Sequence, residues 1–202
     1  NIKNTPDNGG VKFSGTKENI YKLNYHSRVG MNLLIKLFSG SADNIESLYK
    51  LIYNYHWHTL IPSNKTFSIR TKINSKIIPN QNFTTLRIKD AIVDRIQKEI
   101  GSRPSVDKKN SDFYITVYIK ENKIIVFLNS SGKPLFMRGY RTQIHKAAIN
   151  ESLASGILKS TNWLKHKVLY DPMCGSGTFL LEATMQLFNI PAGIVREKYS
   201  FF

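Results

Sequence analysis

The chain has 202 residues with 41% apolar side chains, which suffices for one or two globular domains with buried cores. Its 29 Lys and Arg residues outnumber its 14 Asp and Glu residues, and the net charge of +15 favours a polyanionic partner, although an AT-rich genome also enriches a chain in Lys. The single cysteine excludes an intrachain disulfide, and no apolar run reaches the length of a transmembrane helix.

Helix and strand patterns alternate over the first part of the chain. Glu18 to Tyr25 predicts a short helix, Met31 to Phe38 a buried strand and Ile45 to Tyr53 an amphipathic helix. Thr66 to Ile73 predicts a further strand. Because side chains alternate along a strand, its inner face would carry Phe67, Ile69, Thr71 and Ile73, and its other face Ser68, Arg70 and Lys72.

The clearest amphipathic pattern lies between residues 86 and 100. It predicts a helix that Thr84-Thr85 caps and Gly101 ends. The predicted apolar stripe consists of Ile88, Ala91, Ile92, Ile96 and Ile100. Residues 113–119 then alternate strictly, and the segment 121–123 turns the chain into a second strand over 124–128.

The last third of the chain predicts a helix, a strand and another helix. The first helix spans about Ala147 to Lys159, and one face, formed by Ile149, Leu153 and Ile157, is suited to packing against a sheet. Lys167 to Tyr170 predicts a short strand, which runs into a glycine turn and a helix from Phe179 to Phe188. This order is typical of the first unit of a doubly wound sheet, so the fold class is α/β with an α+β N-terminal part.

The glycine turn reads Asp171-Pro172-Met173-Cys174-Gly175-Ser176-Gly177-Thr178, and its spacing excludes two common phosphate sites. A P-loop needs Lys and then Ser or Thr after its last glycine, where this chain has Thr178 and Phe179. The dinucleotide fingerprint needs a third glycine at Leu180. A two-glycine loop headed by an aspartate suits a nucleotide-like ligand without phosphates, such as S-adenosylmethionine.

The segment from Asp171 to Ala183 resembles the first cofactor motif of the THUMP-domain RNA methyltransferases, particularly the bacterial-type enzymes that methylate guanine N2 in large-subunit ribosomal RNA. Four other segments resemble motifs of this family in the same order. They are a ferredoxin-like strand at Gly9 to Phe13, a THUMP helix at Lys89 to Asp94, a Gly-Tyr-Arg junction at Met137 to Arg141 and a cofactor-packing helix at Ala147 to Ala154. In that helix, Ala148-Ile149 replaces the usual Pro-Leu.

The resemblance implies a domain organisation and an activity. Residues 1–63 would form a ferredoxin-like unit and the start of the THUMP domain, 64–130 the RNA-binding THUMP core, 131–146 a linker, and 147–202 the start of a Rossmann-like methyltransferase domain. The family's N-P-P-Y-type catalytic motif and its ribose-binding acidic residue do not occur in these 202 residues. We therefore expect no methyl transfer by this chain alone and assign no catalytic residue.

Two sets of site residues follow from the resemblance and from the charge. The candidates for cofactor binding are Asp171, Pro172, Cys174, Gly175, Ser176, Gly177, Thr178 and Glu151. The candidates for RNA contact are Arg70, Lys72, Arg87, Lys89, Arg103, Arg138, Arg141 and Lys146. Arg138 and Arg141 are favoured because they flank the domain junction. Tyr53, Tyr55, Trp57 and Trp163 are of a type that stacks on bases, but core packing is the default for them.

Other interpretations are weaker or stay open. Cys174 has no activating base at a telling distance, and His56 and His58 lack the further ligands that a zinc site needs, so we expect neither a nucleophile nor a metal. A THUMP module that binds RNA without catalysis fits the charge, and a tRNA guanine-N2 methyltransferase shares the cofactor motif. A reducing compartment is expected, either the cytoplasm or, in a eukaryote, a plastid or other organelle.

Overall fold

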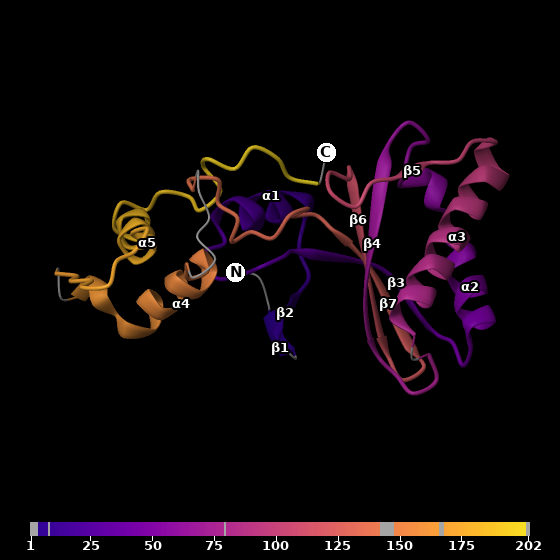
Figure 1. The fold of residues 1–202 in the computed structure, drawn as a ribbon, viewed down its shortest axis with the longest axis horizontal. Helices are drawn as coiled ribbons and strands as arrows, with labels where there is room; N and C mark the ends of the chain where they lie inside the picture. Colours follow the sequence, from indigo (N-terminus) through magenta and orange to yellow (C-terminus); the bar gives the residue numbers. More distant parts are fainter. Residues whose placement is uncertain (1–3, 8, 79, 142–147, 166–167, 201–202) are drawn as a thin grey trace. The chain divides into compact units, whose positions relative to one another are not determined.

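The computed structural model describes residues 4–7, 9–78, 80–141, 148–165 and 168–200 (Figure 1). The chain forms two compact units. The sheet unit consists of Leu34–Gly132 with a few C-terminal residues from Ser200, and the loop unit consists of Asn1–Leu33 and Lys133–Tyr199. No helix among the described residues combines the length and the apolar character needed to cross a membrane.

The sheet unit is a mixed five-stranded sheet with the strand order β3-β7-β6-β4-β5. Its strands are β3 (Leu34–Ser41), β4 (Thr66–Asn74), β5 (Ser105–Val106), β6 (Phe113–Lys120) and β7 (Lys123–Asn129). Strand β4 pairs in parallel with β5 and β6, whereas β7 pairs antiparallel with β3 and β6. The helices α2 (Ile45–Tyr53) and α3 (Gln81–Ile100) lie on the same side of the sheet, and the short 3-10 helix η1 (Trp57–Thr59) follows α2 (Figure 1).

The core of this unit lies between the sheet and the two helices. Leu48 and Ile52 of α2 and Ile88 and Ile92 of α3 are fully buried. They pack with inward-facing strand residues, namely Phe67, Ile115, Val117, Ile119, Ile124 and Val126. Alternation along each strand therefore places every second side chain on the other face of the sheet, which no helix of this unit covers.

A hydrogen bond also joins the two helices at the edge of this core. The Tyr49 hydroxyl donates to Asp94 Oδ2 over 2.8 Å. Burial and the neighbouring Asp94 carboxylate raise the pKa of Tyr49 to about 12, so this hydroxyl keeps its proton at neutral pH.

Most predicted elements of the sheet unit are confirmed, with two boundaries shifted. Helix α2 has the predicted bounds, and Gly101 ends α3 in a left-handed conformation. However, α3 begins at Gln81, because the Asn80 side chain accepts from the Phe83 N–H and caps the helix, so the predicted Thr84-Thr85 cap is wrong. Ile100 is 44% exposed in the last turn and does not belong to the buried stripe.

The predicted strand at Met31–Phe38 is also displaced. Strand β3 begins at Leu34 because its pairing with β7 starts at Asn129 and continues to Lys123 opposite Ser41. Met31 instead lies outside the sheet, where its carbonyl oxygen accepts from the Leu135 N–H over 2.7 Å.

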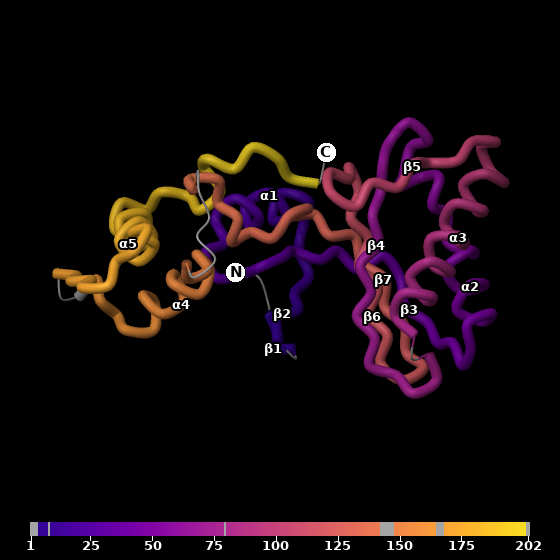
Figure 2. Tube along the Cα trace, in the orientation of Figure 1, coloured from indigo at the N-terminus to yellow at the C-terminus, as the bar shows by residue number. Residues whose placement is uncertain are grey.

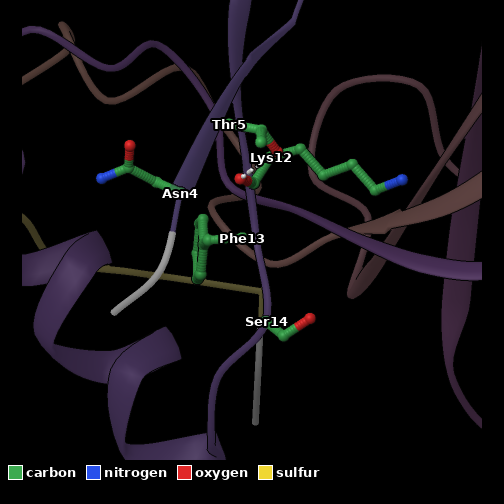
Figure 3. Close-up of a pocket in the computed structure, with 5 residues that line it drawn as sticks. All are labelled: Asn4, Thr5, Lys12, Phe13 and Ser14. Atoms are coloured by element: carbon green, nitrogen blue, oxygen red, sulfur yellow. Dashed lines mark hydrogen bonds between the residues drawn. The ribbon is translucent and has the colours of Figure 1, made fainter. Parts of the chain in front are cut away.

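The loop unit contains a hairpin and three α-helices in its described residues (Figure 2). These elements are β1 (Asn4–Asp7), β2 (Gly10–Phe13), α1 (Lys17–His26), α4 (Glu151–Thr161), the 3-10 helix η2 (Trp163–Lys165) and α5 (Thr178–Leu187). A small apolar cluster of Leu158, Trp163 and Ala183, with Leu169 and Phe179 against it, joins α4 and α5. A pocket of about 160 Å³ beside the hairpin is lined by Asn4, Thr5, Lys12, Phe13 and Ser14, none of which was a candidate site residue (Figure 3).

Two predicted element positions in this unit are wrong. Val168, Leu169 and Tyr170 form no strand, since no other described strand pairs with them, and Val168 and Tyr170 are 78% and 84% exposed. Helix α4 begins at Glu151 rather than near Ala147, because the Asn150 side chain accepts from the amides of Ser152 and Leu153.

The predicted packing face of α4 is wrong as well. Leu153 and Ile157 are 57% and 39% exposed, whereas Ala154 and Leu158 are buried. The helix therefore packs on α5 through a face that is turned away from the predicted one.

The left-handed end of α3 gives a first testable prediction. Gly101 has φ 73°, and its N–H donates to the Gln97 carbonyl oxygen over 2.9 Å. A Cβ added there meets no atom within 4 Å, so Gly101→Ala introduces backbone strain without a clash. We expect a loss of about 1 kcal/mol in the free energy of unfolding, measured by urea denaturation. Gln97→Ala, at an exposed position of the same helix, is the control, and equal stability of the two variants would contradict the prediction.

Candidate functional site

The glycine turn forms an exposed loop that leads into α5. The Met173 N–H donates to Asp171 Oδ1 over 3.1 Å, and the Gly177 N–H donates to the Cys174 carbonyl oxygen over 2.8 Å. Pro172, Cys174, Gly175 and Ser176 are exposed. The second carboxylate oxygen of Asp171, Oδ2, is buried and has no hydrogen-bond partner among the described residues. Such an oxygen is an acceptor that a ligand could satisfy.

Both glycines of the loop have backbone conformations that favour glycine. Gly175 has φ 53°, and Gly177, the residue that caps α5, has φ 71°. A Cβ added at Gly177 would meet no atom within 4 Å, so the space beside it is open. The first turn of α5 also receives no side-chain cap from this residue. The loop therefore presents backbone next to open space, as close approach of a ligand requires.

Arg141 joins two of the candidate cofactor residues. Its Nη2 donates to Thr178 Oγ1 and, over 2.8 Å, to the carbonyl oxygen of Ile149. Its Nε lies 3.4 Å from Glu151 Oε1. Thr178 and Glu151 are only 2% and 6% exposed. The structure thus brings Glu151 and Thr178 together, but through Arg141 and beneath the loop.

A second buried cluster surrounds Glu182, one turn further along α5. Arg138 Nε lies 3.3 Å from Glu182 Oε1, and the Tyr140 hydroxyl donates to the same oxygen over 3.0 Å. Arg138 and Glu182 are 2% and 0% exposed. Burial and the Glu182 carboxylate raise the pKa of Tyr140, which keeps its hydroxyl protonated as a donor.

Backbone groups complete this cluster. Arg138 Nη1 donates to the carbonyl oxygens of Leu135 and Ser27, and Nη2 donates to that of Arg28. Arg28 in turn donates to the carbonyl oxygens of Met185 and Ile190, which lie at and just beyond the end of α5. Burial lowers the pKa of Arg28, and the nearby Glu182 carboxylate opposes this effect. The cluster therefore fixes α5 within the loop unit.

The positions of Arg138 and Arg141 do not fit direct RNA contact. Both guanidinium groups are buried and are engaged by protein carboxylates or carbonyl oxygens. With side chains only 2% and 9% exposed, these arginines stabilise the fold and are poorly accessible to a phosphate. For these two residues the structure therefore favours a structural role over the predicted one.

The other candidates for RNA contact fall into two groups on opposite faces of the sheet unit. Arg70 and Lys72 are on the helix-free face of β4, and Lys72 is exposed. Arg87 and Lys89 are on α3 and pair with Glu46 over 3.0 Å and with Asp90 over 2.9 Å. Beyond the end of α3, Arg103 lies 3.8 Å from Asp94. Lys146 lies outside the described residues.

The aromatic residues singled out in the sequence pack into cores, whereas two others were missed. Trp57 is fully buried and Trp163 is 9% exposed, and Tyr53 and Tyr55 pack against the main core. Tyr118 and Phe127, which the sequence analysis did not consider, lie instead on the helix-free face of the sheet. The alternation of β6 could have identified Tyr118, because its neighbours Val117 and Ile119 face the core. Within the described ranges, His, Cys, Asp and Glu residues nowhere gather in a group of three that could hold a metal ion.

Comparison with known proteins identifies both parts of the chain. Residues 42–129 match the THUMP domain, and residues 138–202 match the RMKL-like methyltransferase domain. The chain belongs to the THUMP-domain methyltransferase family, as the resemblance of its motifs implies.

The relatives include a curated protein and two solved structures. The chain is 42% identical over 194 residues to the ribosomal RNA large subunit methyltransferase K/L of Psychromonas ingrahamii, which aligns with 96% of the chain. It is also similar, at 29% identity and a TM-score of 0.84, to a putative methyltransferase solved in complex with SAH. A structure from Listeria monocytogenes, described as a predicted N6-adenine-specific DNA methylase, has 25% identity and a TM-score of 0.85.

These relatives are longer than the chain. The alignment spans 26% of the Psychromonas protein. The two structural matches cover 99% of this chain but 53% of the SAH complex and 52% of the Listeria protein.

The buried Arg138–Glu182 pair gives the second prediction. Removing one partner leaves the other charge buried and unpaired, so we expect Glu182→Leu to lower the free energy of unfolding by about 3–5 kcal/mol. The double variant Arg138→Met/Glu182→Leu should be less destabilised than the two single variants added together, by about 2 kcal/mol. Chemical denaturation of the four proteins measures this coupling.

The exposed Lys22–Glu18 pair of α1 provides the matched control, since it is an ion pair of 2.7 Å in the same unit. Its double-mutant cycle should show weak coupling that salt screens. Additive effects at Arg138 and Glu182 would refute the proposed dependence of α5 on this pair.

Proposed function

We propose that the chain forms the RNA-binding part and the start of the catalytic domain of an enzyme that transfers a methyl group from S-adenosylmethionine to RNA. The observation that carries this proposal is the Asp171–Thr178 loop, with its two positive-φ glycines and its unpaired carboxylate oxygen, in a chain that also has a THUMP domain. In this proposal the THUMP core comprises residues 64–130, a linker follows to 146, and the catalytic domain starts at 147.

The groups in the loop fit S-adenosylmethionine. Bound there, the cofactor supplies an electrophilic methyl group on a sulfonium. Asp171 Oδ2, which is buried and accepts no hydrogen bond from any described residue, is suited to accept from the ammonium group of the methionine part. Gly175 and Gly177 let the backbone approach the ligand, and no cation in the loop is available to clamp a phosphate.

The acceptor that we propose is the exocyclic N2 of a guanine in large-subunit ribosomal RNA. The motif resemblance supports guanine N2 as the acceptor, and the name of the Psychromonas relative, a ribosomal RNA large subunit methyltransferase, supports ribosomal RNA as the substrate. In this reaction the nitrogen lone pair attacks the methyl carbon, the carbon–sulfur bond breaks, S-adenosylhomocysteine leaves and the nitrogen loses a proton. Aligning the nitrogen with the methyl group would supply much of the rate. The cytoplasm, or an organelle with its own ribosomes, is the compartment in which such RNA occurs.

Two other substrates or roles remain alternatives. The name of the Listeria structure suggests DNA as a substrate, whereas the THUMP match and the net charge of +15 of this chain favour RNA. A THUMP module without catalysis has no physical need for a loop with two positive-φ glycines that leads into a helix.

Cofactor binding is the third prediction. Calorimetry with S-adenosylmethionine would compare this chain with a polypeptide that continues through the catalytic domain of its relatives. We expect binding by the longer polypeptide only, because the ribose-binding acidic residue does not occur in these 202 residues. Gly177→Asp should abolish binding, since a side chain there enters the open space beside the loop. Gly101→Asp, at another glycine with positive φ and open surroundings, should leave the affinity unchanged.

Methyl transfer is the fourth prediction. With labelled S-adenosylmethionine, the longer polypeptide should methylate ribosomal RNA at guanine N2, while this chain alone should give no turnover. If the label appeared in DNA or tRNA instead of ribosomal RNA, the proposed substrate would be wrong. Binding of structured RNA in the absence of any cofactor binding would favour the non-catalytic module.

A further inference from the structure

The helix-free face of the sheet carries a regular arrangement of cations and aromatic rings. Directly paired residues point to the same side, so each rung of the sheet shows which side chains are neighbours. One rung consists of Lys36, Phe127, Thr116 and Arg70. The next consists of Ser39, Ile125, Tyr118 and Lys72, and the one at the β6–β7 turn of Ser41, Lys123, Lys120 and Asn74. We call this surface the open face.

The open face concentrates positive charge that the protein does not neutralise. The four long strands carry five cationic residues and no Asp or Glu. All five cations project from the open face, and none of them has a salt bridge within the described residues. Lys120 and Lys123 even face each other directly, which costs stability unless an anion lies nearby.

On the helices of the same unit most Lys and Arg residues are paired, and only Lys50 and Lys98 have no salt bridge among the described residues. Three cations of α3 have carboxylate partners, namely Arg87 with Glu46, Lys89 with Asp90 and Arg95 with Glu99. The unpaired charge of this unit is therefore not spread evenly over its surface, and the sheet face is the better site for an anionic ligand.

Two aromatic rings lie among these cations. The Tyr118 and Phe127 rings have centroids 5.4 Å apart at an angle of 60°, and Lys72 Nζ lies 5.9 Å from the centre of the Tyr118 ring. Tyr118 is 38% exposed although it lies on a central strand. Phe127 is half-buried beside it. Aromatic rings that reach the surface of a sheet next to cations can stack on bases while the cations contact phosphates.

We propose that the open face binds unpaired nucleotides of the RNA, with bases stacked on Tyr118 and Phe127 and phosphates held by Lys36, Arg70 and Lys72. This inference rests on the proposed function for the identity of the polyanion as RNA. Unpaired nucleotides are required because the bases of a duplex present their faces to one another and not to a protein ring. An acidic peptide would satisfy the cations but would leave the two rings without a stacking partner.

The experiment is fluorescence anisotropy of this chain with a labelled single-stranded RNA and with a duplex of the same sequence. Tyr118→Leu should weaken single-strand binding about tenfold, whereas Tyr118→Phe keeps the ring and should bind as the parent chain does. Tyr25→Leu, which removes a tyrosine of α1 with the same 38% exposure, is the matched control and should have no effect. Thermal denaturation of each variant separates loss of stacking from loss of folding.

The charges are tested by a second pair of variants. Arg70→Gln/Lys72→Gln should reduce the slope of log affinity against log salt concentration by about 1.4, as expected when two phosphate contacts to a single strand are lost. Lys50→Gln/Lys98→Gln removes the same charge from exposed positions of α2 and α3 and should reduce the slope by much less.

Three outcomes would overturn the inference. These are equal affinity for duplex and single strand, unchanged affinity of a folded Tyr118→Leu variant, and competition by polyglutamate that is insensitive to Tyr118. The proposed function is tested independently of this inference. Gly177→Asp should abolish cofactor binding by the longer polypeptide but leave the single-strand affinity unchanged, so either proposal can fail without the other.

Discussion

The arrangement of the loop unit depends on one buried carboxylate, that of Glu182. It pairs with Arg138 and accepts from Tyr140, while Arg141 of the same segment reaches Thr178 at the start of α5. Between them, Gly139 has φ 98°, and a Cβ there would lie 2.6 Å from the Val195 carbonyl oxygen, so only glycine fits. Arg138, Tyr140 and Arg141 thus hold α5 at two successive turns, and the glycine loop that precedes α5 is fixed by a segment far from it in sequence.

The sheet unit shows how one period-2 pattern serves two purposes. The inward residues of β4, β6 and β7 supply most of the sheet's share of the core, and this burial is what makes the sheet stable. The outward residues do not contribute to this core, so their side chains can be polar or charged and suited to binding a ligand. A net charge of +15 does not say where the charge lies, whereas the pairing register assigns to one face five cations that have no salt bridge in the described part of the chain.

Local patterns in the sequence predicted most of the fold, and contacts between distant residues account for the errors. Helix α2, the end of α3 and the β6–β7 hairpin follow from periodicity and turn residues alone. The start of β3 depends on its register with β7, and residues 168–170 need a partner strand before they can form one. Similarly, the burial of Arg138 could not be read from its neighbours, because its carboxylate partner is 44 positions away. The loop itself was predictable, since its glycines and aspartate act through local backbone geometry.

The contacts of Arg141 also divide the candidate cofactor residues by role. Glu151 Oε1 and Thr178 Oγ1 both contact Arg141, and both residues are almost fully buried, so neither is well placed to bind a ligand directly. Asp171 Oδ2 and the exposed residues 174–176 have no hydrogen bond to Arg141. In the proposed cofactor site, recognition would therefore rest on one carboxylate and on backbone groups. The buried contacts of Arg141 with Glu151 and Thr178 would support this site indirectly, because they keep the start of α5 in place.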